Sequence, residues 1–258
     1  MFKELRVAAV LPAFNEEAFI AWAVRSVPLD VFDDVIVVDD ASIDRTRERA
    51  EEAGATVVRH AVNRGVGAAL VTGFRAAVER GNDVAVVIPG DGQADFGALH
   101  AMLEKSLEGY GLVIADRLTG RDATKSGMPR YRVLGSRVLA VATWVTTGIY
   151  VADPQSGYTA IRREALERLP LDRLYPRWGF HNDVLSYCAV TGVPVATVLA
   201  EPIYVTPTGE RITSHIKLWD LIPRHFKVFS RMLGRRVAML VGRRTGRVDP
   251  PAPWSVGL

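Results

Sequence analysis

The stretch Val84-Ala-Val-Val-Ile-Pro-Gly-Asp91-Gly-Gln93-Ala-Asp95 has the pattern of a strand that ends in an oxygen-rich turn. Consecutive apolar residues from Val84 to Ile88 are typical of a parallel strand covered on both faces, and Pro-Gly ends such a strand. Asp91, the side-chain carbonyl of Gln93 and Asp95 supply the hard oxygen ligands that Mg²⁺ and Mn²⁺ prefer. An acidic turn that caps the next helix would have the same sequence, so the interpretation depends on the neighbouring segments.

The composition is that of an ordinary folded protein. The chain has 258 residues, of which 48% are hydrophobic and 24% charged, and these values exclude global disorder. A single cysteine, Cys188, excludes a disulfide framework and a multi-cysteine zinc site. The first residues run directly into a strand, so we expect no signal peptide. The uncharged segment 138–152 is shorter than the ~20 residues of a membrane-spanning helix, which predicts a soluble or membrane-peripheral protein.

Charge is distributed unevenly along the chain. The segment 211–247 holds ten Lys or Arg and one acid, a net charge of +9, whereas the whole chain carries +3. The rest of the chain therefore carries −6. A basic C-terminal segment on a mildly acidic body indicates an anionic partner for that segment. Nucleic acid is a poor candidate, because no recognised nucleic-acid-binding module accompanies the charge.

Strand and helix patterns alternate through the first half of the chain. Short β-branched apolar runs occupy 7–11, 35–39, 56–59, 84–88 and 112–115, and helical patterns between them occupy 16–27, 44–53, 67–80 and 96–107. This alternation predicts an α/β fold with a doubly wound, mostly parallel sheet and helices on both faces. Ligands of such sheets bind beyond the carboxyl ends of the strands, and nearly every predicted strand here is followed by polar residues.

The second half of the chain has a different pattern. We predict helices over 131–150 and from 178 to 191, a short strand before Arg162, and another over 195–205. From Leu218 to Leu240 apolar residues recur at helical spacing, with cations on the other faces. This pattern is typical of an interfacial helix on anionic lipid, and the apolar 138–150 segment could pack beside it. The alternative is that both are core or dimer helices.

Six motifs in fixed order give the chain a family resemblance. They are Leu11-Pro-Ala-Phe-Asn-Glu-Glu17, Val37-Val-Asp-Asp-Ala-Ser-Ile-Asp-Arg-Thr46, Asn63-Arg-Gly-Val-Gly67, Asp91-Gly-Gln93, Ala152-Asp-Pro-Gln-Ser-Gly-Tyr158 and Arg211-Ile-Thr-Ser-His-Ile-Lys217. Over residues 6–220 this series resembles the family 2 glycosyltransferases of the GT-A fold, and most closely the dolichol-phosphate mannose synthase group. The resemblance implies a GT-A domain over 1–217. The charge and the helical spacing predict a basic, membrane-peripheral helical segment over 218–248, and the three prolines after Asp249 predict a flexible tail over 249–258.

The resemblance also implies roles for individual residues. The nucleotide-sugar would be bound by Pro12, Ala13, Glu16, Asp39, Asn63, Gly65 and Asp91, with Asp39 at the base or ribose. Asp91 would be the principal ligand of Mg²⁺ or Mn²⁺ and Gln93 a second, while Asp153 and Gln155 would lie near the sugar and the acceptor phosphate. Phosphate groups would be held by Arg117, Arg211 and Lys217, whose alternative role is solvated surface charge. The family usually has Asp where this chain has Pro89, so the metal site is one carboxylate poorer.

These roles predict an inverting, metal-assisted transferase. It would move a hexosyl group, mannose or glucose, from a GDP- or UDP-sugar to a polyprenyl phosphate at the inner face of the cytoplasmic membrane. A phosphate acceptor is already anionic and needs no strong general base. The first alternative is a soluble family 2 enzyme that acts on a saccharide or small-molecule hydroxyl, with Asp183 as catalytic base; Asp183 could also simply cap its helix. The second is a non-catalytic nucleotide-sugar-binding protein with a degenerate metal site.

Overall fold

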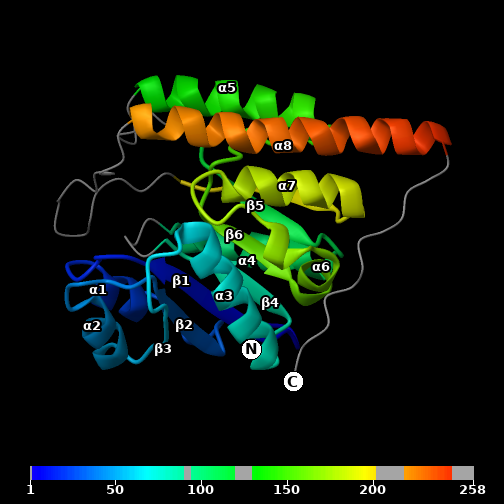
Figure 1. Cartoon of the computed structure of the whole chain (residues 1–258). Coiled ribbons are helices and arrows are strands. Elements are labelled where there is room, and N and C mark those ends of the chain that lie inside the picture. The colour runs from blue at the N-terminus through cyan, green and yellow to red at the C-terminus, as the bar shows by residue number, and fades with distance from the viewer. Residues whose placement is uncertain (1, 90–93, 120–129, 202–217, 246–258) are drawn as a thin grey trace.

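A mixed seven-stranded sheet forms the centre of the protein. The computed structural model describes residues 2–89, 94–119, 130–201 and 218–245 (Figure 1). The strand order is β3-β2-β1-β4-β6-β5-β7, and only β6 runs antiparallel to its neighbours among the described strands. The strands are β1 (Val7–Ala13), β2 (Asp34–Asp39), β3 (Thr56–Arg59), β4 (Val84–Val87), β5 (Leu112–Asp116), β6 (Thr159–Arg162) and β7 (Val195–Leu199). The predicted doubly wound, mostly parallel sheet is confirmed.

The helices follow the predicted alternation. They are α1 (Ile20–Arg25), α2 (Thr46–Glu52), α3 (Val66–Glu79), α4 (Leu99–Leu107), α5 (Arg130–Thr147), α6 (Arg163–Arg168), α7 (Phe180–Thr191) and α8 (Leu218–Thr245), with 3-10 turns η1 (Phe96–Ala98) and η2 (Leu171–Arg173). The prediction of a helix from residue 16 was wrong by four residues. The segment before α1 is instead tied to the loop after β2, as described below.

Both faces of the sheet are buried, as the continuous apolar strands require. On β1, Val7, Ala9 and Leu11 join one core with residues of α1 and α4, whereas Ala8 and Val10 join a second core with residues of α3, α6 and α7. The five residues from Val7 to Leu11 are fully buried. Successive side chains of β1 therefore point to opposite faces of the sheet.

The carboxyl ends of the six strands other than β6 share one edge of the sheet with the segment that precedes β6. β5 is antiparallel to β6, and β6 is antiparallel to β4, so β4 and β5 point the same way. Thr159, the first residue of β6, is in register with Val87 and Ile114. The turn 153–158 therefore emerges beside the ends of β1, β2, β4 and β5. This edge gathers the loops that carry the predicted site residues.

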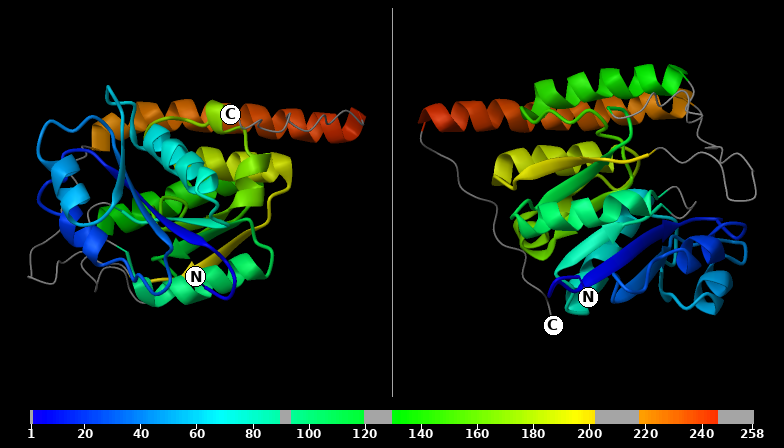
Figure 2. Two further views of the ribbon diagram at one scale, coloured as in Figure 1. Left: turned by 90° about the horizontal axis from the view of Figure 1, so that it is seen from below. Right: turned by 180° about the vertical axis from the view of Figure 1, so that it is seen from behind.

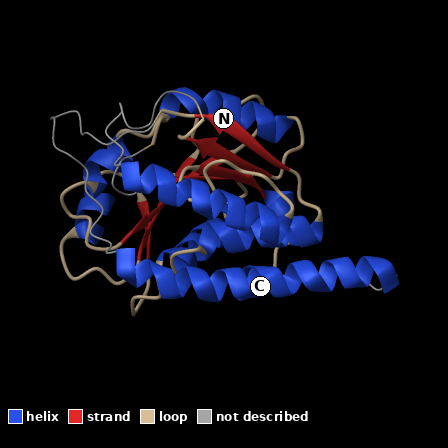
Figure 3. Cartoon of the chain, turned by 90° about the horizontal axis from the view of Figure 1, so that it is seen from above, coloured by secondary structure: helices blue, strands red, loops and turns tan. Residues whose placement is uncertain are grey.

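An additional layer of two helices lies outside the sheet sandwich. α5 and α8 lie side by side beyond α7, and α8 extends past the end of α5 (Figures 1 and 2). Seen from above, the long helix α8 lies along one side of the molecule, and one of its ends extends beyond the other elements (Figure 3). Among the described helices, none combines the length and apolarity of a membrane span. The predicted packing of the apolar segment 138–150 beside the C-terminal helix is confirmed for α5 through Thr147.

Candidate active site

The loop after β1 is held by the loop after β2. Pro12 and Ala13 end β1 in register with Val38 and Asp39, so both loops leave the sheet together. Asn15 and Ala41 have positive φ angles of 56° and 64°, a conformation that non-glycine residues rarely adopt without support. That support is a set of backbone donors bonded to side chains: Asn15 N to Ser42 Oγ (2.9 Å), Glu16 N to Thr46 Oγ1 (2.8 Å), and Glu17 N to Asp44 Oδ2 (3.2 Å).

Asp39, the predicted nucleoside-binding carboxylate, is fully buried at the end of β2. Its Oδ1 accepts a hydrogen bond from Ser42 N at 2.9 Å, and its Oδ2 lies 3.2 Å from Nε of the half-exposed Arg59. The carboxylate is thus charge-balanced by a cation whose other side faces solvent. Arg59 had no predicted role; its place at the end of the neighbouring strand is the signal that could have identified it.

The neighbouring Asp40 organises the glycine-rich loop after β3. It is buried, and it accepts hydrogen bonds from His60 Nδ1 (2.7 Å), Arg64 N (2.8 Å) and Gly65 N (2.7 Å). Sequence analysis assigned Asp40 no function. Because its oxygens are committed to this loop, Asp40 acts as the support that orients the loop carrying Asn63, which is itself exposed.

The glycines of this loop permit close packing against the segment before α7. Gly65 has φ of 97°, and a Cβ there would lie 2.6 Å from the Pro176 carbonyl oxygen. A Cβ on Gly67 would lie 2.4 Å from the carbonyl oxygen of Tyr175. The motif Asn63-Arg-Gly-Val-Gly67 therefore brings two chain segments together, and both of its glycines are required sterically.

Arg117 and Asp153, predicted at separate tasks, form one buried ion pair. Arg117 Nε donates to Asp153 Oδ2 at 2.7 Å, and a second nitrogen of the guanidinium donates to Oδ1 at 3.2 Å. The Asp153 carboxylate is fully buried and the Arg117 side chain is 20% exposed. A bidentate pair of this kind fixes the plane of the Arg117 guanidinium.

Gln155 is linked to α5 through a chain of buried amides and hydroxyls. Its side-chain amide donates to Asn182 Oδ1, and Asn182 Nδ2 donates to Thr143 Oγ1 at 2.7 Å. Asn182 and Thr143 are fully buried. Sequence analysis missed both residues, because a threonine and an asparagine in apolar helices carry no motif of their own.

Asp183 is enclosed and ion-paired. Its Oδ2 accepts a hydrogen bond from Tyr175 N at 2.9 Å and lies 3.6 Å from a guanidinium nitrogen of Arg231. Its Oδ1 accepts a hydrogen bond from Arg235, and the residue is fully buried. The alternative that Asp183 caps its helix is wrong, since Gly179 is the N-cap and the Asp183 side chain bonds elsewhere. Asp183 anchors α8 to α7.

Four predicted site residues, Asp91, Gln93, Arg211 and Lys217, lie outside the described residues. Asp95, a possible substitute ligand for the missing carboxylate at Pro89, is already engaged: Oδ1 accepts from Gly97 N (2.9 Å) and Oδ2 from Glu201 N (2.8 Å). Within the described ranges no group of three or more carboxylate, histidine or cysteine side chains is placed to hold a metal ion.

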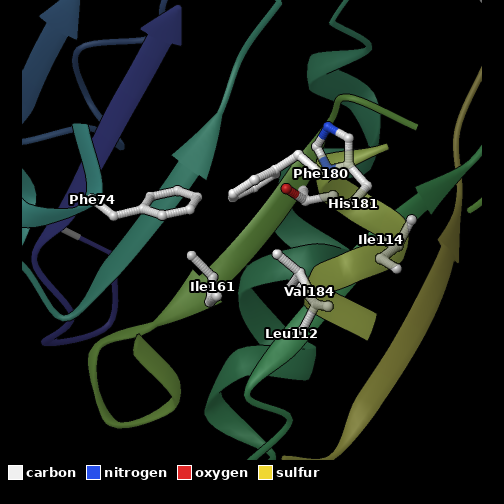
Figure 4. Close-up of a pocket in the computed structure, with 8 residues that line it drawn as sticks. Phe74, Leu112, Ile114, Ile161, Phe180, His181 and Val184 are labelled. Carbon is white, nitrogen blue, oxygen red and sulfur yellow. The ribbon is translucent and has the colours of Figure 1, made fainter. Parts of the chain in front are cut away.

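A small apolar pocket lies beneath α7 (Figure 4). It is lined by Phe74, Leu112, Ile114, Thr159, Ile161, Phe180, His181 and Val184. None of these residues belongs to the predicted site, so we interpret the pocket as a packing gap between α3, β5, β6 and α7. His181 differs from the others because it is titratable and lies close enough to Arg117 and Asp153 to respond to their charges.

The environment of His181 predicts a pH-dependent stability. The pKa of His181 is lowered from 6.5 to about 4, mainly by burial and secondarily by the Arg117 charge, while the Asp153 charge opposes the change. The unfolded chain therefore binds more protons between pH 6.5 and 4, so the stability present above pH 6.5 is lost on acidification, by at most about 1.4 kcal/mol per pH unit. Chemical unfolding at several pH values should give a flatter profile for His181→Gln than for the wild type. Equal slopes would contradict this prediction.

Comparison with known proteins identifies the sequence family. A family model described as Glycosyl transferase family 2 matches residues 8–170. A UDP-N-acetylglucosamine–dolichyl-phosphate N-acetylglucosaminyltransferase of Methanococcus voltae is 27% identical over 242 residues, 87% of this chain and 93% of its own length. An undecaprenyl-phosphate mannosyltransferase of Micrococcus luteus is 29% identical over 208 residues, 75% of this chain and 82% of its own length.

The fold is also found among solved structures. Glucosyl-3-phosphoglycerate synthase from Mycobacterium tuberculosis, in complex with Mn²⁺, uridine diphosphate and phosphoglyceric acid, superposes with a TM-score of 0.65 at 27% identity. The match covers 90% of this chain and 79% of the synthase. The predicted GT-A architecture is thereby confirmed.

Proposed function

Because the chain belongs to glycosyl transferase family 2 and is a hexosyltransferase, we propose that it transfers its sugar to a polyprenyl phosphate. The donor would be a GDP- or UDP-hexose, mannose or glucose, and the product would have the inverted configuration. The reaction would take place at the inner face of the cytoplasmic membrane. Relatives named for dolichyl and undecaprenyl phosphate acceptors support this choice of acceptor.

The state of Asp183 is the observation that favours a phosphate acceptor. A hydroxyl acceptor must lose a proton, and Asp183 is the carboxylate that sequence analysis offers as the base. In the structure Asp183 is fully buried, and its oxygens are engaged by Tyr175 N, Arg231 and Arg235. A phosphate monoester is anionic at neutral pH and needs no such base, so the enclosure of Asp183 is compatible with transfer.

The remaining residues divide into a donor side and an acceptor side. On the donor side, Asp39 would bind the nucleoside from between the interlocked loops after β1 and β2. On the acceptor side, Arg117 would bind the acceptor phosphate, oriented by Asp153, while Gln155 positions the sugar or the phosphate. Arg211 and Lys217 would contribute further positive charge to the phosphates.

The departing nucleoside diphosphate needs compensation of its negative charge. Asp91 and Gln93 would hold Mg²⁺ or Mn²⁺, which when bound stabilises the diphosphate leaving group as a Lewis acid. The oxygen donors of this pair suit such ions. The M. tuberculosis synthase binds Mn²⁺ together with uridine diphosphate, which supports a divalent ion in this position.

Transfer of radiolabelled sugar tests the proposal. The protein is incubated with a panel of GDP- and UDP-sugars and polyprenyl phosphate, with Mn²⁺, Mg²⁺ or EDTA. Label that enters the lipid fraction in the presence of metal, and that is lost in Asp91→Asn, supports the proposal and identifies the donor. Label in a soluble product would move the assignment to a hydroxyl acceptor. Nucleotide binding without turnover would favour the non-catalytic alternative, with Pro89 as its cause.

A further inference from the structure

The many cations of α8 suggest that its charged side faces solvent, but in the structure arginines of this helix face the protein. Three arginines of α8 face the protein: Arg235 and Arg231 pair with Asp183, and Arg236 donates to the Thr147 carbonyl oxygen at 3.1 Å. The helix also buries Val228 and Met232 against Tyr175. Much of the positive charge of this segment is therefore used inside the protein, and the side of α8 that faces away from it is apolar.

α5 continues that exposed apolar side. We define the outer apolar face by Val138, Val141 and Trp144 on α5 and Leu233, Val237 and Leu240 on α8, all of which are exposed. These residues recur at intervals of three on α5 and of four and three on α8, so each set forms a stripe along one side. With 28 residues α8 is about 42 Å long and α5, with 18, about 27 Å. An exposed stripe of this extent is typical of a surface that is covered in the working protein.

We propose that the outer apolar face of α5 and α8 lies in the surface of a lipid bilayer, a proposal that rests on the proposed function. The charges on this layer favour lipid over a second copy of the chain. Arg137 on α5 and Lys227 on α8 are exposed, whereas 130–147 and 221–245 contain no Asp or Glu. In a symmetric dimer the same patch must supply both partners of each ion pair, and this patch has only cations. Anionic headgroups supply the missing charge.

Hydrogen bonds connect α5 and α8 to the acceptor side of the site, which is a second argument for contact with a bilayer. Thr143, on the inner side of α5, reaches Gln155 through Asn182. Arg235, on the inner side of α8, bonds Asp183 of α7. A lipid phosphate whose tail stays in the bilayer would thus approach the site from the helices that contact the same bilayer. The face proposed here binds lipid by apolar insertion, with the cations at its margin.

Vesicle binding by the full chain tests the proposal. We expect the wild type to co-sediment with vesicles of phosphatidylcholine and phosphatidylglycerol. The double variant Val141→Asp/Val237→Asp should bind about 100-fold more weakly, because each buried valine contributes about tenfold. Leu29→Asp is the matched control: Leu29 is 74% exposed but lies before β2, so its binding should equal that of the wild type. Thermal unfolding of each variant checks that the fold is retained.

Two results would overturn the proposal. The first is a double variant that binds vesicles as tightly as the wild type. The second is a wild-type dimer that the double variant converts to monomer while vesicle binding is unchanged. A separate assay with a short-chain, water-soluble prenyl phosphate tests the proposed transfer activity independently of the proposed membrane contact. Transfer to that acceptor should survive in the double variant, whereas failure of transfer in every variant would count against the proposed function alone.

Discussion

Arg117→Ala should lower the free energy of unfolding by about 3 kcal/mol relative to the wild type, because the substitution leaves the fully buried Asp153 carboxylate without its cation. If Arg117 also holds the acceptor phosphate, kcat/KM should fall by about 100-fold or more, the usual effect of removing one charged group that stabilises a transition state. Chemical unfolding and steady-state transfer measure the two effects separately. Unchanged stability together with unchanged transfer would contradict both parts of the prediction.

A charge-neutral pair separates the structural role of Arg117 from its functional role. Asp153→Asn combined with Arg117→Gln removes both charges and keeps polar groups able to bond each other, so most of the lost stability should return. Transfer should remain low, since neither amide can balance a phosphate dianion. Arg117→Lys is the second control: it keeps the charge but loses the bidentate geometry, and should retain intermediate activity. Recovery of transfer in the neutral pair would show that Arg117 acts only on folding.

The first half of the fold could be predicted because its signals are local. Runs such as 35–39 and 84–88 are apolar, β-branched and ended by Gly, Pro or Asp, and these features specify buried parallel strands. The late start of α1 was not predictable in the same way. Residues 16–19 belong to the predicted helical pattern, but the Ser42, Thr46 and Asp44 side chains bind the backbone donors of residues 15–17 and hold this segment in a loop. A contact between segments nearly 30 residues apart overrides the local preference.

In the candidate site, too, local sequence motifs could be predicted, whereas contacts between distant segments could not. The motifs identified residues at the ends of strands, and the structure brings Arg117 together with Asp153 as an ion pair. Supporting residues escaped detection because their roles exist only after folding. Asp40 holds the loop after β3, and Asn182 holds Gln155, yet neither residue type is unusual for its position. The roles of Asp39, Gln155 and the residues outside the described ranges stay predictions.

The C-terminal helix illustrates how a correct pattern leaves the orientation open. Apolar residues do recur along the helix, but they lie on both of its sides: Val228 and Met232 are buried, whereas Leu233 and Val237 are exposed. Periodicity cannot say which side turns toward the protein. The structure resolves this through Asp183, a single buried carboxylate that binds Arg231 and Arg235 and so turns the arginines inward. One acid on a different helix thereby determines which side of α8 is exposed.

Asp183→Asn should therefore destabilise the protein by about 3 kcal/mol, because it leaves two partly buried guanidinium groups without a counter-charge. Proteolysis should attack α8 before the sheet domain, since the lost contacts are those that attach α8 to α7. Chemical unfolding and limited proteolysis measure these effects. A catalytic base would behave differently: the same variant would lose transfer and keep its stability.

Rescue distinguishes these two roles of Asp183. Arg235→Met removes the cation that Asp183 neutralises and keeps an apolar stem of similar length. The loss of unfolding free energy in Asp183→Asn/Arg235→Met should therefore be about 2 kcal/mol smaller than the sum of the losses in the two single variants. Transfer to a phosphate acceptor should recover with α8 attachment in the double variant. A missing base cannot be restored by deleting an arginine on another helix. Transfer that stays absent in a stable double variant would therefore return Asp183 to the chemistry, and the acceptor would then be a hydroxyl group.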